Sequence, residues 1–462
     1  ALSVDDVSVV VSGVADLSVT GDLGLVRVTA SGETTARYTA LTLGTVTVTT
    51  NAVSGGFGLT GDVTIEDLDY NDASSGVTRL DWAGAFDLDG EGTADLLNPG
   101  ASLPSPADLT IDFSSSLRFQ ISGSVTGTGG SGTELIAAGP VSISGSADFS
   151  LSRSTTDVDT DGDGTADLLG ATLDQVALSV DGVSVVVSGV ADLGVTGDLG
   201  LVRVTPLGSG TARYTALTLG TVTVTTNAVT GDFGLTGAVT INDLDYNDAT
   251  VGFGRLDWTS AFDLDADGTP DLLNPGASLP SPADLSIDFT AGLEFRVSGS
   301  VTGTGGSGTE LIAAGPLSIS GSAEFALSRS TTDVDADGDG TADLLGATLD
   351  QVALSVDDVS VVVSGVADLS VTGDLGLVRV TASGETTARY TALTLGTVTV
   401  TTNAVTGDFG LTGAVTVEDL AYNDAAVGVG RLDWTSAFEL DAEGTPDLLN
   451  PGASLPSPAA LT

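Results

Sequence analysis

The stretch ALSVDDVSVVVSGVADL opens the chain at residues 1–17 and returns at residues 353–369, and ALSVDGVSVVVSGVADL stands between them at residues 177–193. Each start follows the previous one by 176 residues. Self-similarity at a fixed period is typical of repeat proteins, in which neighbouring units stabilise one another. We therefore divide the chain into repeat 1 (residues 1–176), repeat 2 (177–352) and a truncated repeat 3 (353–462). We expect it to be a segment of a longer array.

Each full repeat contains a weaker half-repeat. GTADLLNPGASL, at residues 92–103, resembles GTADLLGATL, at residues 164–173, and an acidic stretch precedes each. The half-repeats end near residues 97 and 169 in repeat 1, and near 273 and 345 in repeat 2. The acidic stretches alternate at spacings of 72 and 104 residues. The blades of a propeller would recur at one spacing, so this alternation disfavours a propeller.

Apolar and polar residues alternate along most of each repeat. In residues 141–151 the apolar residues Val141, Ile143, Ala147, Phe149 and Leu151 occupy every second position, and Gly145 takes the one remaining position of that series. Ser or Asp occupies every position between them. A period of two predicts β-strands with one buried face.

The alternation of residues 176–180 resumes at 183–195, after Asp181-Gly182. Two such runs separated by Asp-Gly predict a β-hairpin turn. No segment shows a 3.6-residue apolar stripe. We predict an all-β fold of mainly antiparallel strands, arranged as β-sandwich-like units or as a continuous β-ladder.

The chain is strongly acidic. Sixty-two acids stand against thirteen bases, all of them arginine, and the formal charge is −49. Such a surface repels nucleic acid and anionic membranes and attracts cations. A GC-rich genome or a salt-loving organism would also produce this bias, but neither explains acids at a fixed spacing.

The chain contains no His, Cys or Met. It therefore has no disulfide, thiol nucleophile or zinc–thiolate site, and a Ser nucleophile would lack its usual base. Paired carboxylates can hydrolyse glycosides, but here the same acids recur in every repeat, which is not typical of an enzyme. No run of eighteen apolar residues and no signal peptide is found. We expect a protein that is not an enzyme and does not insert into a membrane.

The stretch DVDTDGDGTADLL, at residues 157–169, places five aspartates in eleven residues. Alternate carboxylates at Asp159, Asp161 and Asp163 can turn inward in a tight loop, and Gly164 permits the bend. Ca²⁺ prefers six to eight hard oxygen ligands at relaxed geometry, whereas softer metals prefer the nitrogen and sulfur ligands that are missing here. We predict a calcium-binding loop.

This spacing resembles the calcium loops of EF-hands, dockerins, thrombospondin type 3 repeats and FG-GAP repeats. The resemblance aligns Asp159, Asp161, Asp163, Gly164 and Asp167 with EF-hand loop positions 1, 3, 5, 6 and 9. It implies that Thr165, and Thr341 in repeat 2, contribute a backbone carbonyl. Position 12 is Gly170 instead of an acid and flanking helices are absent, so we expect no true EF-hand. Water, Asp157 (Asp333 in repeat 2) or a neighbouring strand would supply the remaining ligands.

The frame occurs five times, and we name each acidic loop after the residue at position 1 of the frame, which is Asp87, Asp159, Asp263, Asp335 or Glu439. The candidate ligands are Asp87, Asp89, Glu91 and Asp95; Asp157, Asp159, Asp161, Asp163, Thr165 and Asp167; Asp263, Asp265, Asp267 and Asp271; Asp333, Asp335, Asp337, Asp339, Thr341 and Asp343; and Glu439, Asp441, Glu443 and Asp447. The alternative is a solvated acidic turn, but recurrence in both half-repeats favours a cation site.

Two further motifs recur. IEDLDYND, at residues 65–72, loses one acid in repeat 3, where Ala421 replaces the counterpart of Asp69, so we interpret it as a polar turn in preference to a cation site. In RLDW, which begins at Arg79, a strand would place Arg79 and Asp81 on one face, where they could pair. Trp82 would then pack in the core, with stacking on sugar rings as the alternative.

The repeats and acidic loops together resemble the repeat regions of giant bacterial adhesins and fibrous matrix proteins. That resemblance implies an extracellular or cell-surface, bacterial or archaeal protein that associates with itself through its repeats. We predict a calcium-stiffened structural segment of a filament or adhesin stalk. The alternative is an extracellular module that binds a polysaccharide or a cell-surface partner.

Overall fold

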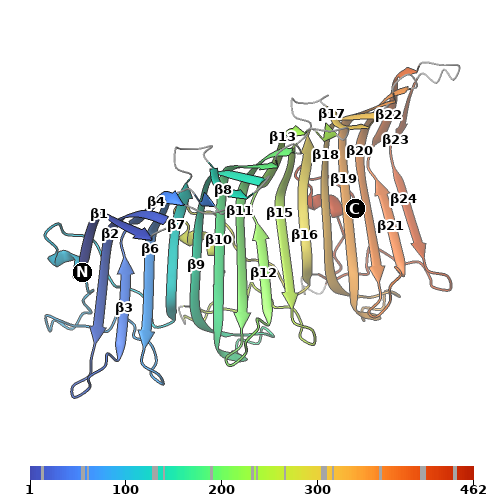
Figure 1. Cartoon of the computed structure of the whole chain (residues 1–462). Helices are drawn as coiled ribbons and strands as arrows, with labels where there is room; N and C mark the ends of the chain where they lie inside the picture. Colours follow the sequence, from blue (N-terminus) through green and yellow to red (C-terminus); the bar gives the residue numbers. More distant parts are fainter. Residues whose placement is uncertain are drawn as a thin grey trace. The chain divides into compact units, whose positions relative to one another are not determined.

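A computed structural model describes the chain apart from residues 12–14, 54–57, 60–61, 127–133, 139–140, 188–190, 230–233, 236–237, 265–266, 303–309, 315–316, 364–366, 406–412 and 441–444. The described residues form β-strands, three 3₁₀-helical turns and irregular segments (Figure 1). The predicted all-β class is confirmed. None of the described helical turns is long or apolar enough to cross a bilayer.

Corresponding elements recur at the period of the repeat. Those that begin in repeat 1 are β1 (Leu2–Val11), β2 (Ala15–Val28), β3 (Tyr38–Leu43), β4 (Val46–Val53), β5 (Gly58–Leu59), β6 (Asp62–Ala73), η1 (Pro99–Ser102), β7 (Leu117–Thr126), β8 (Glu134–Ala138), β9 (Val141–Val158) and β10 (Leu168–Val187). Those that begin in repeat 2 are β11 (Ala191–Thr205), β12 (Tyr214–Leu219), β13 (Val222–Val229), β14 (Gly234–Leu235), β15 (Ala238–Ala249), η2 (Pro275–Ser278), β16 (Leu293–Thr302), β17 (Glu310–Ala314), β18 (Leu317–Val334) and β19 (Leu344–Val363). Repeat 3 contains β20 (Ala367–Thr381), β21 (Tyr390–Leu395), β22 (Val398–Val405), β23 (Ala414–Val417), β24 (Leu420–Ala425) and η3 (Pro451–Ser454).

The chain divides into two compact units. Unit 1 comprises residues 1–188, 195–218 and 249–288, and unit 2 comprises 189–194, 219–248 and 289–462. Within unit 1, β6 pairs with β3 and β4 on one side and with β7 on the other, and β7 pairs with β9. Within unit 2, β15, β16, β18, β19 and β20 pair in that order. Every one of these pairings is antiparallel.

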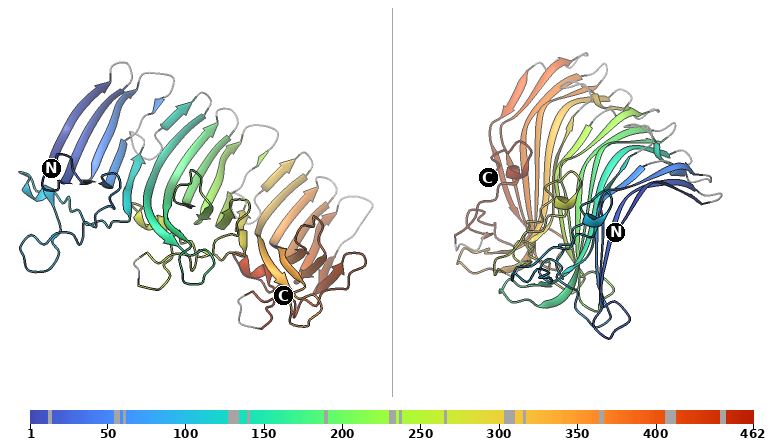
Figure 2. Two further views of the ribbon diagram at one scale, coloured as in Figure 1. Left: turned by 90° about the horizontal axis from the view of Figure 1, so that it is seen from below. Right: turned by 90° about the vertical axis from the view of Figure 1, so that its left-hand side faces the viewer.

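In each unit an irregular segment lies against one face of the sheet (Figure 2). In unit 1 this segment contributes Trp82, Ile111 and Phe113, which pack against Ala40 of β3. The exposed fractions of Trp82 and Ile111 are both 0%. A sheet covered by an irregular segment, and not by a second sheet, favours the predicted ladder over the predicted sandwich within each unit.

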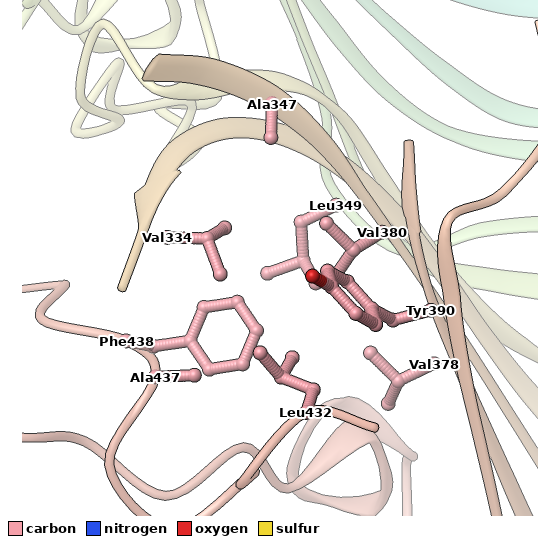
Figure 3. Close-up of a cluster of buried hydrophobic side chains, with 9 residues drawn as sticks. All are labelled: Val334, Ala347, Leu349, Val378, Val380, Tyr390, Leu432, Ala437 and Phe438. Atoms are coloured by element: carbon pink, nitrogen blue, oxygen red, sulfur yellow. The ribbon is translucent and has the colours of Figure 1, made fainter. Parts of the chain in front are cut away.

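The core of unit 2 combines residues of two repeats (Figure 3). Val334 and Leu349, on β18 and β19, belong to repeat 2, whereas Leu432 and Phe438 belong to the irregular segment of repeat 3. All four side chains are at most 2% exposed. Burial of a large apolar side chain contributes about 1.5–3 kcal/mol, so this shared cluster binds the two repeats together.

The predicted hairpin at Asp181-Gly182 is wrong. β10 runs without a turn through these residues and pairs with β9, with a register shift between Asp181 and Ser184. Residues 182 and 183 stand opposite Gly145 alone, which defines a β-bulge. Gly182 has a φ of 61°, and in repeat 1 Asp6 takes a φ of 50° at the same place. Gly182 has the positive φ that a hairpin turn would need, but β9 pairs with β10 on both sides of this residue, so the chain forms a bulge instead of a turn.

The predicted strand at RLDW is also wrong, whereas the predicted burial of Trp82 is confirmed. Residues 79–82 are irregular. Arg79 does not pair with Asp81. Its guanidinium donates hydrogen bonds to the carbonyl oxygens of Ser115 (3.1 Å) and Ser116 (3.1 Å) and to Thr155 Oγ1 (2.6 Å). The motif therefore fastens the irregular segment to the rest of unit 1.

Candidate metal centres

Within the described part of the chain, three of the five acidic loops bring carboxylates together. The groups are Asp87, Asp89 and Asp95; Asp159, Asp161 and Asp167; and Asp335, Asp337 and Asp339. In each group one oxygen of every carboxylate lies within 4.8 Å of the others. Three convergent hard oxygens are a ligand set that could hold a metal ion.

In the Asp159 and Asp335 loops the aspartate at position 1 organises the backbone around it. Asp159 Oδ1 accepts a hydrogen bond from the Gly162 amide (2.8 Å), and its Oδ2 accepts one from the Gly164 amide (2.7 Å). Gly338 and Gly340 donate in the same way to Asp335, both at 2.7 Å. The glycines are required here because Gly162 and Gly164 have φ values of 78° and 83°, which other residues rarely adopt.

The acid at position 9 closes the loop. Asp167 Oδ2 accepts hydrogen bonds from the Thr160 amide (3.0 Å) and hydroxyl (2.6 Å). The Asp167 amide donates to the Val158 carbonyl, just before the loop, at 2.9 Å. The same closing bond occurs in all five loops, at 2.6–2.9 Å. Both half-repeats therefore build the same local turn.

These contacts keep the carboxylates ionised. Burial raises the pKa of Asp159, but hydrogen bonds from the amides of Gly164, Gly162 and their neighbours outweigh it, and the pKa is lowered. The pKa of Asp335 is lowered chiefly by the Gly340 amide. The Thr160 hydroxyl and amide lower the pKa of Asp167. The loops are therefore negatively charged and prepared for a cation at neutral pH.

The Asp159 and Asp335 loops each rest on the following repeat. The Asp159 amide donates to the Ala261 carbonyl, and the Asp335 amide to the Ala437 carbonyl, both at 3.1 Å. In unit 2 the Asp335 loop and Glu439 line one cavity of about 550 Å³. The spacing of the acids does not reveal these partners, although Ala-Phe stands directly before Asp263 and Glu439 in the sequence.

The other two loops are described only in part. Asp263 accepts hydrogen bonds from the Asp267 amide (3.1 Å) and the Gly268 amide (3.0 Å), and Asp271 accepts one from the Leu264 amide (2.6 Å). Asp447 accepts one from the Leu440 amide (2.6 Å). The predicted ligands Asp265, Asp441 and Glu443 lie outside the described residues. The partial loops follow the same frame as the complete ones.

Several predicted ligands lie beside the three clusters but outside them. Asp157 and Asp333 accept hydrogen bonds from the amides of Gly170 and Gly346, both at 2.7 Å. Asp163 accepts one from the Thr165 amide, also at 2.7 Å. The remaining members of this set are Glu91, Thr165, Thr341 and Asp343. Their role as ligands stays a prediction.

The acidic stretch at residues 65–72 is not a turn. It lies in β6, where Asp69 pairs with Gln120 of β7 and Asp67 with Ser122. Glu66, Asp67 and Asp69 line a cavity of about 400 Å³ together with Thr42 and Thr110 and with the acids Asp108 and Asp112. Burial, then the charge of Asp67, raises the pKa of Asp69 to about 7. The Thr42 hydroxyl opposes this rise and Asp112 adds to it.

In repeat 2 an arginine neutralises the negative charge of the corresponding acids. Arg296 replaces Gln120, its Nη2 lies 2.5 Å from Asp245 Oδ2, and its Nε lies 3.0 Å from Asp243 Oδ2. Asp243 and Asp245 are the counterparts of Asp67 and Asp69. The acidic cavity is therefore a property of repeat 1 and not of the repeat in general.

We expect Gln120→Arg to stabilise unit 1 at pH 8. The folded-state pKa of Asp69 lies above its unfolded value of 3.8, so protonation contributes stability that is complete below about pH 4 and is lost as the pH rises through about 7. At pH 8 a half-buried ion pair between the new arginine and Asp69 should raise the free energy of unfolding by about 1 kcal/mol. This corresponds to a rise of about 2–4 °C in the melting temperature. Thermal melts at pH 5 and pH 8 measure it. A gain that is equal at both pH values would contradict the assignment, and Gln120→Met is the uncharged control.

Comparison with protein-family models, with curated proteins and with solved structures found no match to this chain. The acidic loops and the packing of the repeats are therefore the features from which its function is inferred.

Proposed function

We propose that the chain is a calcium-stabilised structural repeat protein, a segment of a long extracellular filament or adhesin stalk. One observation carries the proposal. The Asp159 and Asp335 loops gather three carboxylates at the end of one repeat, and each donates a backbone hydrogen bond to the next repeat. An ion held in such a loop would stabilise the junction between repeats.

Calcium fits the donor set better than other metals. The three clusters contain only carboxylates, and the chain offers no His or Cys for zinc or copper. Magnesium requires a strict octahedron, whereas calcium accepts additional carbonyl and water ligands at variable angles. A loop without a bidentate acid at position 12 belongs to the weak class, with a Kd of about 10⁻⁴–10⁻³ M. Such a site is filled where calcium is abundant, which is outside the cell.

In this function the bound ion supplies positive charge among the carboxylates. The residues of the loop hold the shape that receives it, because the amides of Gly162 and Gly164 orient the Asp159 carboxylate. Thr160 orients Asp167 in the same loop. Ordering of the loop is thereby coupled to the buried Val158, which precedes it, and to Ala261 of the next repeat.

Equilibrium dialysis against radioactive calcium tests the proposal. We expect saturable binding of several ions per chain at millimolar calcium, and the loss of one ion in Asp159→Asn. Asp5→Asn is the matched control, because Asp5 is an exposed acid of β1 that stands outside the acidic loops. Equal calcium binding by the two variants would reject the site at Asp159.

The alternative of a carbohydrate-binding module gains no support from Trp82 and Trp258. Trp82 and Trp258 are both 0% exposed, so neither ring can stack on a sugar. Their burial favours the structural role.

A further inference from the structure

In each unit the sheet has a covered face and an uncovered face. The irregular segment lies against one face, and no second layer of described residues lies against the other (Figure 2). Side chains point to the two faces in alternation along a strand. On β9, Ser150 is 3% exposed, whereas Leu151 is 38% exposed. The apolar side chain of this pair therefore lies on the uncovered face.

The covered face carries the smaller side chains in the middle of the strands. Ala177 of β10 packs against Leu285 of the irregular segment and is 1% exposed. The next residue, Leu178, is 40% exposed. In unit 2, Ala353 of β19 is 0% exposed and Leu354 is 41% exposed. A contiguous set of large apolar side chains left in solvent marks an interaction surface.

These side chains form a continuous band across the strands, because paired residues of antiparallel strands point to the same face. Ile121 of β7 lies opposite Leu151 of β9, and Phe149 of β9 lies opposite Leu178 of β10. We name as the apolar band of unit 1 the residues Tyr70, Phe119, Ile121, Phe149, Leu151 and Leu178. The apolar band of unit 2 consists of the residues 176 positions later, with Val297 in place of Ile121 as the one difference.

The border of the apolar band differs in charge from the chain as a whole. Arg153 Nε lies 2.5 Å from Asp174 Oδ1, and Arg203 Nη2 lies 3.7 Å from Asp174 Oδ2. In unit 2, Arg329 Nε lies 2.6 Å from Asp350 Oδ1 in the same way. Asp174 is thus paired with two bases, although the chain has a net charge of −49. Two copies of the chain can approach through this face without opposing unpaired acids.

We propose that the chain forms a dimer in which the apolar bands of two copies pack face to face. The two sheets then form the layers of a sandwich about 10 Å apart. A second copy presents the same rows of side chains at the same strand spacing, so the two bands can interdigitate. The arginine–aspartate pairs lie at the rim, as polar groups do in stable interfaces. The exposed acidic loops repel a second copy at other surfaces.

The uncovered face offers enough area for this dimer. In unit 1 the band continues onto β3 and β2, where Leu41 lies opposite Tyr70 and Leu25 lies opposite Leu41. In unit 2 it continues onto β20 and β21, where Leu377 lies opposite Leu393. A band six strands wide and about four residues high covers about 400 Å² of sheet. The two units together offer about 800 Å², which is what each partner contributes to a standard interface.

The inference goes beyond the proposed function, because it depends on the sheet and not on the acidic loops. Sedimentation velocity of the full chain is measured over a dilution series, once in chelator and once in calcium. We expect a reversible dimer in both buffers. Sodium chloride should strengthen the dimer, because it screens the repulsion between two acidic chains. A dimer that forms only in calcium would contradict the proposal and point to association through the loops.

A variant with four leucines of the two bands replaced tests the surface itself. The substitutions are Leu151→Thr, Leu178→Thr, Leu327→Thr and Leu354→Thr, and threonine is retained well in strands. The loss of apolar area should raise the dissociation constant of the dimer at least about 100-fold. The matched control replaces four exposed leucines outside the bands by threonine, namely Leu96, Leu169, Leu272 and Leu345. Circular dichroism shows whether both variants are folded.

Photo-crosslinking provides a second readout in an otherwise unchanged chain. Leu178→benzoylphenylalanine should give a covalent dimer on irradiation. Leu207→benzoylphenylalanine should not, because Leu207 is exposed between β11 and β12 and lies outside the band. A chain that is monomeric at every concentration, or equal dissociation constants for the two leucine variants, would overturn the proposal.

Discussion

In a buffer with a calcium chelator, unit 1 is expected to melt about 10 °C lower than in 10 mM calcium. At 10 mM calcium a site with a Kd of about 10⁻⁴–10⁻³ M is in about 10- to 100-fold excess of ligand, which stabilises the folded state by about 1.4–2.7 kcal/mol per site. Unit 1 contains two complete clusters, at Asp87 and at Asp159. For a domain of this size, about 1 kcal/mol shifts the melting temperature by about 2–4 °C, so two filled sites account for the expected difference.

The control for this result is ionic strength. With a net charge of −49, the folded chain gains stability from any cation that screens its acids. The melts should therefore be compared with magnesium at 10 mM and with sodium chloride of matched ionic strength. We expect less than half of the calcium effect from either, and a smaller calcium effect in the variant Asp87→Asn, Asp159→Asn. Identical melting curves in chelator and in calcium would refute the proposed function.

Replacing Trp82 by alanine is expected to destabilise unit 1 by about 3–5 kcal/mol. The side chain is fully buried against Ala40, Ile111 and Phe113, so its loss leaves a large cavity. Trp82 Nε1 also donates a hydrogen bond to Asn71 Oδ1 (2.9 Å), and Asn71 is itself 0% exposed. Urea unfolding followed by far-UV circular dichroism measures the loss.

Trp434→Ala provides a control at the corresponding position of unit 2. Trp434 makes the same bond to Asn423 (3.1 Å) but is only partly buried, so its removal should cost about 1–2 kcal/mol. Trp82→Phe separates the two contributions, since it keeps most of the buried area and removes the donor to Asn71, at about 1–3 kcal/mol. Equal losses for Trp82→Ala and Trp434→Ala would show that repeat 3 is packed as fully as repeat 1.

The spacing of the acids along the chain predicted one part of the candidate metal centres and not another. The spacing of the acids identified Asp87, Asp159 and Asp335 as position 1 of their loops, because the hydrogen bonds that shape each loop join residues at most nine positions apart. It could not identify Ala261 or Ala437 as partners, because each stands about a hundred residues away and contributes only a backbone carbonyl. A carbonyl leaves no signal in the pattern of side chains.

The sequence by itself determined the features that depend on neighbours along the chain. These are the 176-residue repeat, the alternation that defines strands with a buried face, and the glycine-bent acidic loops. The tertiary structure alone decided where the strands end and what covers them. Asp181-Gly182 became a bulge because β9 continues past it. The segment around Trp82 remained irregular because its hydrogen bonds go to residues 71, 113, 115 and 116. Alternation reports which side of a strand is buried, but only the partner that supplies the hydrogen bonds determines whether the strand continues.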